Sequence, residues 1–188
     1  MTASGYSICP ADRLGRSLRQ WRALRRVKQN HAAELLHVSQ AMVSRWEAGT
    51  QVPTIDEQAL LRRLMAARLD SAADHALARL VASSAGTAHL VCDLTHRLLA
   101  ASPQRSRDWG PRTPELIGVS LWPYATPEIA AAEEALSGYG WFEPDPPAIE
   151  VATGANDSPI VPIRPGRMRW TRFQLSDGAF VRLAETIA

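Results

Sequence analysis

The residues with the clearest chemistry are cations gathered at the amino-terminal end of the 188-residue chain. Residues 1–70 carry eleven Lys and Arg side chains against six acids, a formal charge of +5. Residues 71–188 carry ten against thirteen, a formal charge of −3. A basic surface attracts polyanions such as nucleic acids. The charge distribution therefore places the candidate binding surface in the first 70 residues.

Residues that could perform catalysis or bind metal do not gather in a motif. The sequence has no phosphate-binding glycine loop, no GxSxG or HExxH and no dinucleotide-binding glycine run. The candidate acids are scattered along the chain: Asp93, Asp108, Glu115 and Asp177. Cys9 and Cys92 lack the spacing of a zinc site or a disulfide framework. We expect no enzymatic activity, no metal and no cofactor.

The composition is that of a folded protein outside the membrane. Hydrophobic residues make up 46% of the chain and charged residues 21%, which is enough to bury a core. No apolar stretch approaches the ~20 residues that a membrane span needs. Residues 1–13 lack the apolar core of a signal peptide. We expect a cytoplasmic, nucleoid-associated protein without membrane contact.

The chain up to about residue 83 is predicted to be all-α. Apolar residues repeat at helical spacing in the first helix: Leu14, Leu18, Trp21 and Leu24. A second helix is expected over 29–36, and a third from after Ser39, a good N-cap, to Ala48, where Gly49 ends it. Capping boxes at 54–57 and 71–74 predict two more helices, about five in total.

Residues 29–48 have the layout of a helix-turn-helix. Ala33 supplies the small residue that two crossing helices require, and His37 stands at the turn, where positive φ is needed. Apolar residues suit the inner face: Ala32, Leu36, Val38, Val43 and Trp46. The run from Ala33 to Gly49, within a likeness over about 14–69, resembles the Cro/phage-repressor (XRE) class of DNA-binding proteins.

This resemblance implies a recognition helix over about Gln40–Ala48 that enters the major groove of double-stranded DNA. Gln40 can then bond an adenine, Ala41 can touch a thymine methyl, and Arg45 can bond a guanine or a phosphate. Gln29 matches the family position that bonds a phosphate, where the helix dipole helps. The complete set of expected DNA-binding residues is Arg16, Arg19, Lys28, Gln29, Ser39, Gln40, Ala41, Ser44 and Arg45.

After residue 86 the pattern changes to that of an α+β domain with an antiparallel sheet and helices on one face. Strands are expected over 89–93, 97–102, 148–153, 168–175 and 179–184, the last two joined by a hairpin at 176–178. Residues 102–114 are expected to form a loop or a very short helix, and 127–136 a helix. This order, with an acidic turn after the first strand, resembles a PAS-type sensor domain.

The second half leaves its own role open. Its aromatic residues could line a ligand pocket, although such residues more often fill a core: Trp109, Trp122, Tyr124, Tyr139, Trp141, Phe142, Trp170 and Phe173. A haem would need an axial ligand from His75, His89 or His96, and a lone histidine is usually structural. Cys92 fits a buried small hydrophobe.

The expected organisation is a helix-turn-helix domain over 1–70, a helical linker over 71–87 and a PAS-like domain over 88–188. Between the two halves, apolar residues at 4-3-4 spacing form a thin coiled-coil seam, which predicts a homodimer: Leu69, Ala73, Ala76 and Leu80. We expect a sequence-specific transcriptional regulator whose carboxy-terminal domain dimerises, senses a small molecule or contacts a protein. The alternative is an antitoxin-like or adaptor interaction module with secondary DNA binding.

Overall fold

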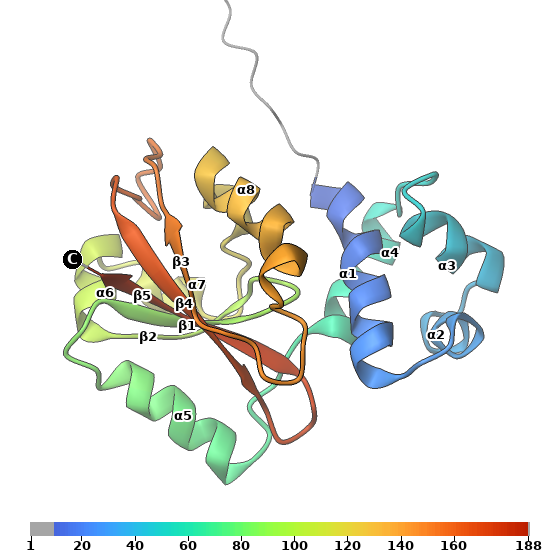
Figure 1. Cartoon of the computed structure of the whole chain (residues 1–188), viewed down its shortest axis with the longest axis horizontal. Coiled ribbons are helices and arrows are strands. Elements are labelled where there is room, and N and C mark those ends of the chain that lie inside the picture. The colour runs from blue at the N-terminus through green and yellow to red at the C-terminus, as the bar shows by residue number, and fades with distance from the viewer. Residues whose placement is uncertain (1–9, 188) are drawn as a thin grey trace, which may run out of the picture. The chain divides into compact units, whose positions relative to one another are not determined.

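The computed structural model describes residues 10–187, which form two compact units (Figure 1). The helical unit comprises the described residues up to Ala66, and the sheet unit begins at Ala67. No helix in the described part of the chain is long and apolar enough to cross a membrane. Cys9 lies outside the described residues.

The helical unit contains α1 (Pro10–Arg25), α2 (Gln29–Leu36), α3 (Gln40–Glu47) and α4 (Ile55–Met65). Its core contains most of the apolar positions that the helical periodicity predicts: Leu14, Leu18, Trp21, Ala32, Ala33, Leu36, Val43, Trp46, Leu61 and Met65. The expected Thr54–Glu57 capping box starts α4. The all-α prediction for this region is confirmed.

The turn between α2 and α3 has the predicted backbone. His37 adopts the left-handed conformation at φ 54° and ψ 40°, and its N–H donates to the Glu34 carbonyl. Ser39 is the N-cap of α3, with its hydroxyl accepting from the Met42 N–H. The turn is therefore closed by local hydrogen bonds, and these fix where α3 begins.

The sheet unit is built on five antiparallel strands in the order β2-β1-β5-β4-β3. The strands are β1 (Ala88–Cys92), β2 (Leu98–Ala101), β3 (Ile149–Ala152), β4 (Arg167–Gln174) and β5 (Phe180–Ile187). β1 pairs with β5 at Leu90↔Leu183, and β4 pairs with β5 at Trp170↔Ala184. The α+β prediction and the element order expected from the PAS resemblance are both confirmed.

Helices cover the sheet on both faces, so the expectation of helices on one face is wrong. Figure 1 shows α5 (Ala72–Ala82) on one side and α8 (Pro127–Ala135) on the other. The short helices α6 (Pro103–Trp109), α7 (Thr113–Leu116), η1 (Trp122–Tyr124) and η2 (Leu136–Tyr139) complete the connection from β2 to β3. Residues alternate along each strand, so Leu90 and Cys92 face the α5 side while His89 and Val91 face the other.

The helix expected to be a linker packs on the sheet. α5 begins with the predicted Ser71–Asp74 capping box and buries Val81 against Leu90 and Val181. The division between units falls after Ala66, slightly before the boundary expected at residue 70. Of the expected coiled-coil seam, Leu69 packs on this same core, and Leu80 is 69% exposed. The homodimer stays a prediction.

Candidate functional site

A chain of hydrogen bonds leads from the core of the helical unit to the start of α3. Glu47, buried at the end of α3, accepts from Arg22 Nε and Nη2, both at 2.6 Å. The same carboxylate accepts from Gln29 Nε2 at 2.9 Å. Gln29 Oε1 in turn accepts from Gln40 Nε2 at 2.8 Å. Four residues from α1, α2 and α3 therefore form one polar network.

The network fixes the orientation of two side-chain amides. A carboxylate only accepts hydrogen bonds, so Gln29 must turn its NH₂ toward Glu47 and its oxygen toward Gln40. Gln40 must then present its NH₂ to Gln29. One N–H and the carbonyl oxygen of Gln40 stay available on an exposed side chain. This donor–acceptor pair matches the N7 and N6 groups of adenine.

The other residues expected on α3 take different positions. Ala41 and Arg45 are exposed, and Ser44 is half-buried. The Nη2 atom of Arg45 lies 3.9 Å from the Met42 sulfur. Ser39 uses its hydroxyl as the N-cap of α3, and its expected contact with DNA stays a prediction.

The residues expected to contact phosphate lie on α1 and at the start of α2. Arg16 and Arg19 are exposed on α1, and Lys28 is exposed at the N-cap position of α2. No side chain caps α2, so its first N–H groups keep the capacity to bind an anion. The nearby Gln29 amide is already engaged by Glu47 and Gln40.

Three residues of this site were missed from the sequence. A Cβ on Gly15 would lie 1.8 Å from the Trp46 carbonyl oxygen, so α1 and α3 cross where only glycine fits. A lone glycine inside an apolar helical pattern was the available signal. Arg22 and Glu47 are 25 residues apart, and nothing in their local sequence pairs them. The hydrogen bond from Arg22 to Glu47 also raises the pKa of Arg22.

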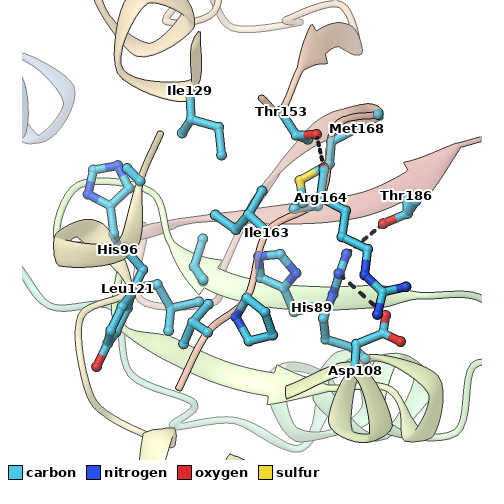
Figure 2. Close-up of a pocket in the computed structure, with 18 of the residues that line it drawn as sticks. His89, His96, Asp108, Leu121, Ile129, Thr153, Ile163, Arg164, Met168 and Thr186 are labelled. Carbon is cyan, nitrogen blue, oxygen red and sulfur yellow. Dashed lines mark hydrogen bonds and ion pairs between the residues drawn. The ribbon is translucent and has the colours of Figure 1, made fainter. Parts of the chain in front are cut away.

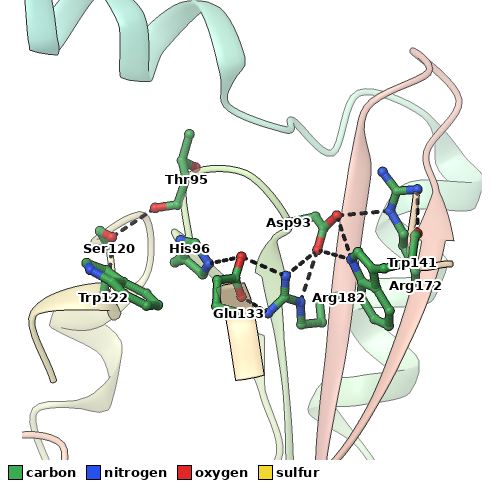
Figure 3. A network of polar contacts seen from close by, with 9 residues as sticks. All are labelled: Asp93, Thr95, His96, Ser120, Trp122, Glu133, Trp141, Arg172 and Arg182. Atoms are coloured by element: carbon green, nitrogen blue, oxygen red, sulfur yellow. Dashed lines mark hydrogen bonds and ion pairs between the residues drawn. The ribbon is translucent and has the colours of Figure 1, made fainter. Parts of the chain in front are cut away.

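The sheet unit contains a second, largely buried polar network (Figure 3). Arg172 and Arg182 stand directly opposite each other on β4 and β5, and Asp93 accepts from both guanidinium groups. Trp141 Nε1 also donates to Asp93. A pair of like charges across strands is unfavourable on its own, so Asp93 is what allows both arginines to be buried.

The network continues through Arg182 to Glu133 on α8. Arg182 Nη1 donates to Glu133 at 2.6 Å, and His96 Nε2 lies 3.3 Å from the same carboxylate. Burial alone would raise the pKa of Glu133, but Arg182 and His96 more than offset it and hold that pKa below its usual range. Burial opposes the charge of Arg182 as well, yet Glu133 and Asp93 raise its pKa. Both groups therefore stay charged in the interior.

A cavity of about 240 Å³ lies beside this network, on the face of the sheet away from α5 (Figure 2). Some of the aromatic residues expected either to line a pocket or to fill a core do line this cavity: Trp109, Trp122, Tyr124 and Trp170. Trp141 is instead wholly buried in the core, and Tyr139 is exposed. Cys92 is buried, as expected. In residues 10–187, no cluster of three or more His, Cys, Asp or Glu side chains could hold a metal ion.

Comparison with known proteins supports the amino-terminal assignment. Residues 13–76 match the family model described as "Helix-turn-helix domain". No curated protein matches the chain. Among solved structures, the PAS domain of an HTR-like protein from Haloarcula marismortui is 17% identical, with a TM-score of 0.40, and the match covers 61% of this chain and 96% of that one. An RNA-binding light-oxygen-voltage receptor is 11% identical with a TM-score of 0.41, and the match covers 94% of this chain and 59% of that one. The family match agrees with the helix-turn-helix formed by α2 and α3.

Proposed function

We propose that this chain is a sequence-specific regulator of transcription that places α3 in the major groove of double-stranded DNA. The observation that carries the proposal is the oriented amide of Gln40, held through Gln29 by the buried Glu47. An exposed side chain whose donor and acceptor are fixed in advance loses less entropy on binding and discriminates better between bases.

The remaining residues divide into base readers and phosphate binders. Gln40 bonds an adenine through its free N–H and carbonyl oxygen, and Ala41 contacts a thymine methyl. Arg45 bonds a guanine or a phosphate, and Ser44 lies beside it on the same helix. The phosphate contacts come from the uncapped start of α2 and from the exposed cations Arg16, Arg19 and Lys28.

The sheet unit supplies the regulatory part of the proposal. A single helix-turn-helix contacts one half-site, so a homodimer doubles the sequence that is read. We assign dimerisation, sensing or protein contact to the sheet unit, which holds a cavity and an exposed face of α5 around Leu80. Light scattering at micromolar concentration tests the dimer, and a strictly monomeric mass contradicts it.

Two substitutions test the division between base readers and phosphate binders. Gln40→Ala should remove the preference at one base position and cost about 1–3 kcal/mol on the preferred site. Arg16→Ala should weaken all sequences alike and reduce the salt dependence of binding. The matched control is Gln104→Ala on α6 of the sheet unit. If Gln40→Ala leaves the preferred sequence unchanged, the placement of α3 in the groove is wrong.

A further inference from the structure

Two buried nitrogen atoms on the wall of the sheet unit's cavity, one on Arg105 and one on His89, have no hydrogen-bond partner among the described residues. Arg105 is 6% exposed and His89 is 8% exposed, and both line the cavity. Neither Nε of Arg105 nor Nδ1 of His89 has a hydrogen-bond partner among the described residues. Buried polar atoms are nearly always satisfied, so unsatisfied donors on a cavity wall indicate that something else occupies it.

The charge of Arg105 is only partly balanced. Its Nη2 atom donates to Thr186 Oγ1 at 2.7 Å and to the Thr87 carbonyl at 3.4 Å, both neutral acceptors. Asp108 is its one ion-pair partner in the described part of the chain, at 3.8 Å and with a side chain 44% exposed. Arg182, by contrast, meets two buried carboxylates. A cation enclosed in this way favours an anion at its free edge.

His89 lies against the same indole ring as Arg105. The ring centroids of His89 and Trp109 are 5.1 Å apart, and the Arg105 guanidinium carbon lies 5.5 Å from the Trp109 ring. Burial and the nearby charges of Arg105 and Arg182 lower the pKa of His89, so its imidazole is neutral at neutral pH. A neutral imidazole can donate one hydrogen bond from Nδ1 without adding charge.

The rest of the cavity wall is mainly apolar, but it also includes three further arginines and two acids: Arg164, Arg167, Arg182, Asp108 and Glu133. Its apolar residues include Val91, Leu121, Trp122, Ile129, Val161 and Met168. The volume of the cavity is about 240 Å³. This space suits a compact apolar group that carries one anionic end.

We propose that this cavity binds a small monocarboxylate with an apolar body, whose oxygens accept from Arg105 Nε and His89 Nδ1. A planar carboxylate suits the edge of a guanidinium group. This proposal names the ligand for the sensing role in the proposed function. It rests on that function for the regulatory effect of the ligand, but the binding itself does not involve DNA.

Titration calorimetry on the full chain with phenylacetate tests the proposal directly. About ten buried non-hydrogen atoms with one charge-assisted contact should give a dissociation constant of about 1 mM or tighter. The neutral isostere phenylacetamide should bind at least about tenfold more weakly, because it cannot balance Arg105. Equal binding of the acid and the amide, or no saturable binding of the acid, overturns the proposal.

Variants locate the binding in this cavity. Arg105→Met should weaken phenylacetate at least about tenfold. Arg107→Met, two residues along α6 and exposed, should leave the dissociation constant unchanged. Should Arg105→Met fail to fold, Ile129→Trp fills the apolar end with Arg105 intact and should abolish binding. Unchanged affinity in a folded Arg105→Met or Ile129→Trp chain contradicts the assignment.

DNA binding is measured on the same preparations without phenylacetate. If the chain binds DNA but does not bind phenylacetate, only the proposal for the cavity is refuted. Intact carboxylate binding in a chain with no DNA preference removes the proposed regulator and leaves the cavity assignment standing.

Discussion

Replacing Glu47 by glutamine should both destabilise the helical unit and loosen base recognition by α3. The substitution keeps the shape of the side chain but removes its charge. Glu47 accepts three hydrogen bonds, two from Arg22 and one from Gln29. An amide offers one oxygen and turns an NH₂ group toward one of these donors.

The structure sets the size of the stability loss. Removing one partner of a buried ion pair costs about 3–5 kcal/mol. Here the side chains of Glu47 and Arg22 are 5% and 16% exposed, and Arg22 keeps its hydrogen bond to the Val27 carbonyl. Water and the Val27 carbonyl can therefore still solvate the Arg22 guanidinium once Glu47 has lost its charge. We accordingly expect a loss of about 2–3 kcal/mol in the free energy of unfolding.

Urea unfolding of the full chain, followed by fluorine NMR of 5-fluorotryptophan, measures this loss. Trp21 and Trp46 are buried in the helical unit and report on it separately from the tryptophans of the sheet unit. The control is Glu34→Gln, which neutralises an exposed acid whose ion-pair partner among the described residues is the exposed His31. We expect the control to change stability by less than about 0.5 kcal/mol.

A double-mutant cycle separates the ion pair from simple loss of packing. Arg22→Met with Glu47→Gln should cost about 2 kcal/mol less than the sum of the single variants, because no buried charge is left unpaired. Purely additive costs, or a Glu47→Gln chain within about 0.5 kcal/mol of the parent, would refute the role given to this network. Base preference at the position read by Gln40 should also become weaker in Glu47→Gln.

Two further predictions concern a helix crossing and a buried histidine. Gly15→Ala should destabilise the helical unit by at least about 2 kcal/mol, because the new Cβ meets the Trp46 carbonyl at 1.8 Å. Urea unfolding should show no such loss for Gly138→Ala, whose Cβ would meet nothing within 4 Å, and equal losses would contradict the crossing. For His89, burial lowers the pKa of the folded state below the ordinary 6.5. As the pH falls below 6.5, the unfolded chain therefore takes up a proton on His89 before the folded chain does. The free energy of unfolding then decreases by up to about 1.4 kcal/mol for each unit that the pH is lowered. His89→Phe should flatten this slope between pH 6.5 and 5 in urea titrations. The control His75→Gln, at an exposed histidine, should keep the slope. An unchanged slope in His89→Phe would count against a buried neutral imidazole.

Features set by neighbouring residues were predictable from the sequence. The left-handed His37, the Ser39 cap and the capping box at Thr54 all depend on a few adjacent side chains, and each is found in the structure. The strand positions were predicted in the same way, from strand-like runs of residues and the turn residues between them.

Features that join distant parts of the chain were not predictable. Asp93 meets Arg172 and Arg182 only because β1, β4 and β5 lie together in the sheet. Period-two alternation could have placed Arg172 on the buried face of its strand with Met168 and Trp170, but it could not name the acid that balances it. The Glu47 network could not be predicted for the same reason, because Arg22 and Glu47 lie 25 residues apart in the sequence.

Placement of α5 depended on packing rather than on its own sequence. Its capping box was predictable from Ser71 and Asp74, but its attachment to the sheet depends on contacts with residues far along the chain. Asp74 also accepts from the backbone N–H of Ser176, in the hairpin between β4 and β5. A helix expected to be a linker is therefore held to the sheet at both its start and its apolar face.

The most direct test of base recognition by α3 is selection of bound duplexes from a random library at near-physiological salt, with the parent chain and Gln40→Ala in parallel. We expect a two-fold symmetric motif with half-sites about one helical turn apart, and loss of preference at one position per half-site in the variant. Salt-sensitive binding without an enriched motif, or an identical motif from both chains, would contradict this expectation.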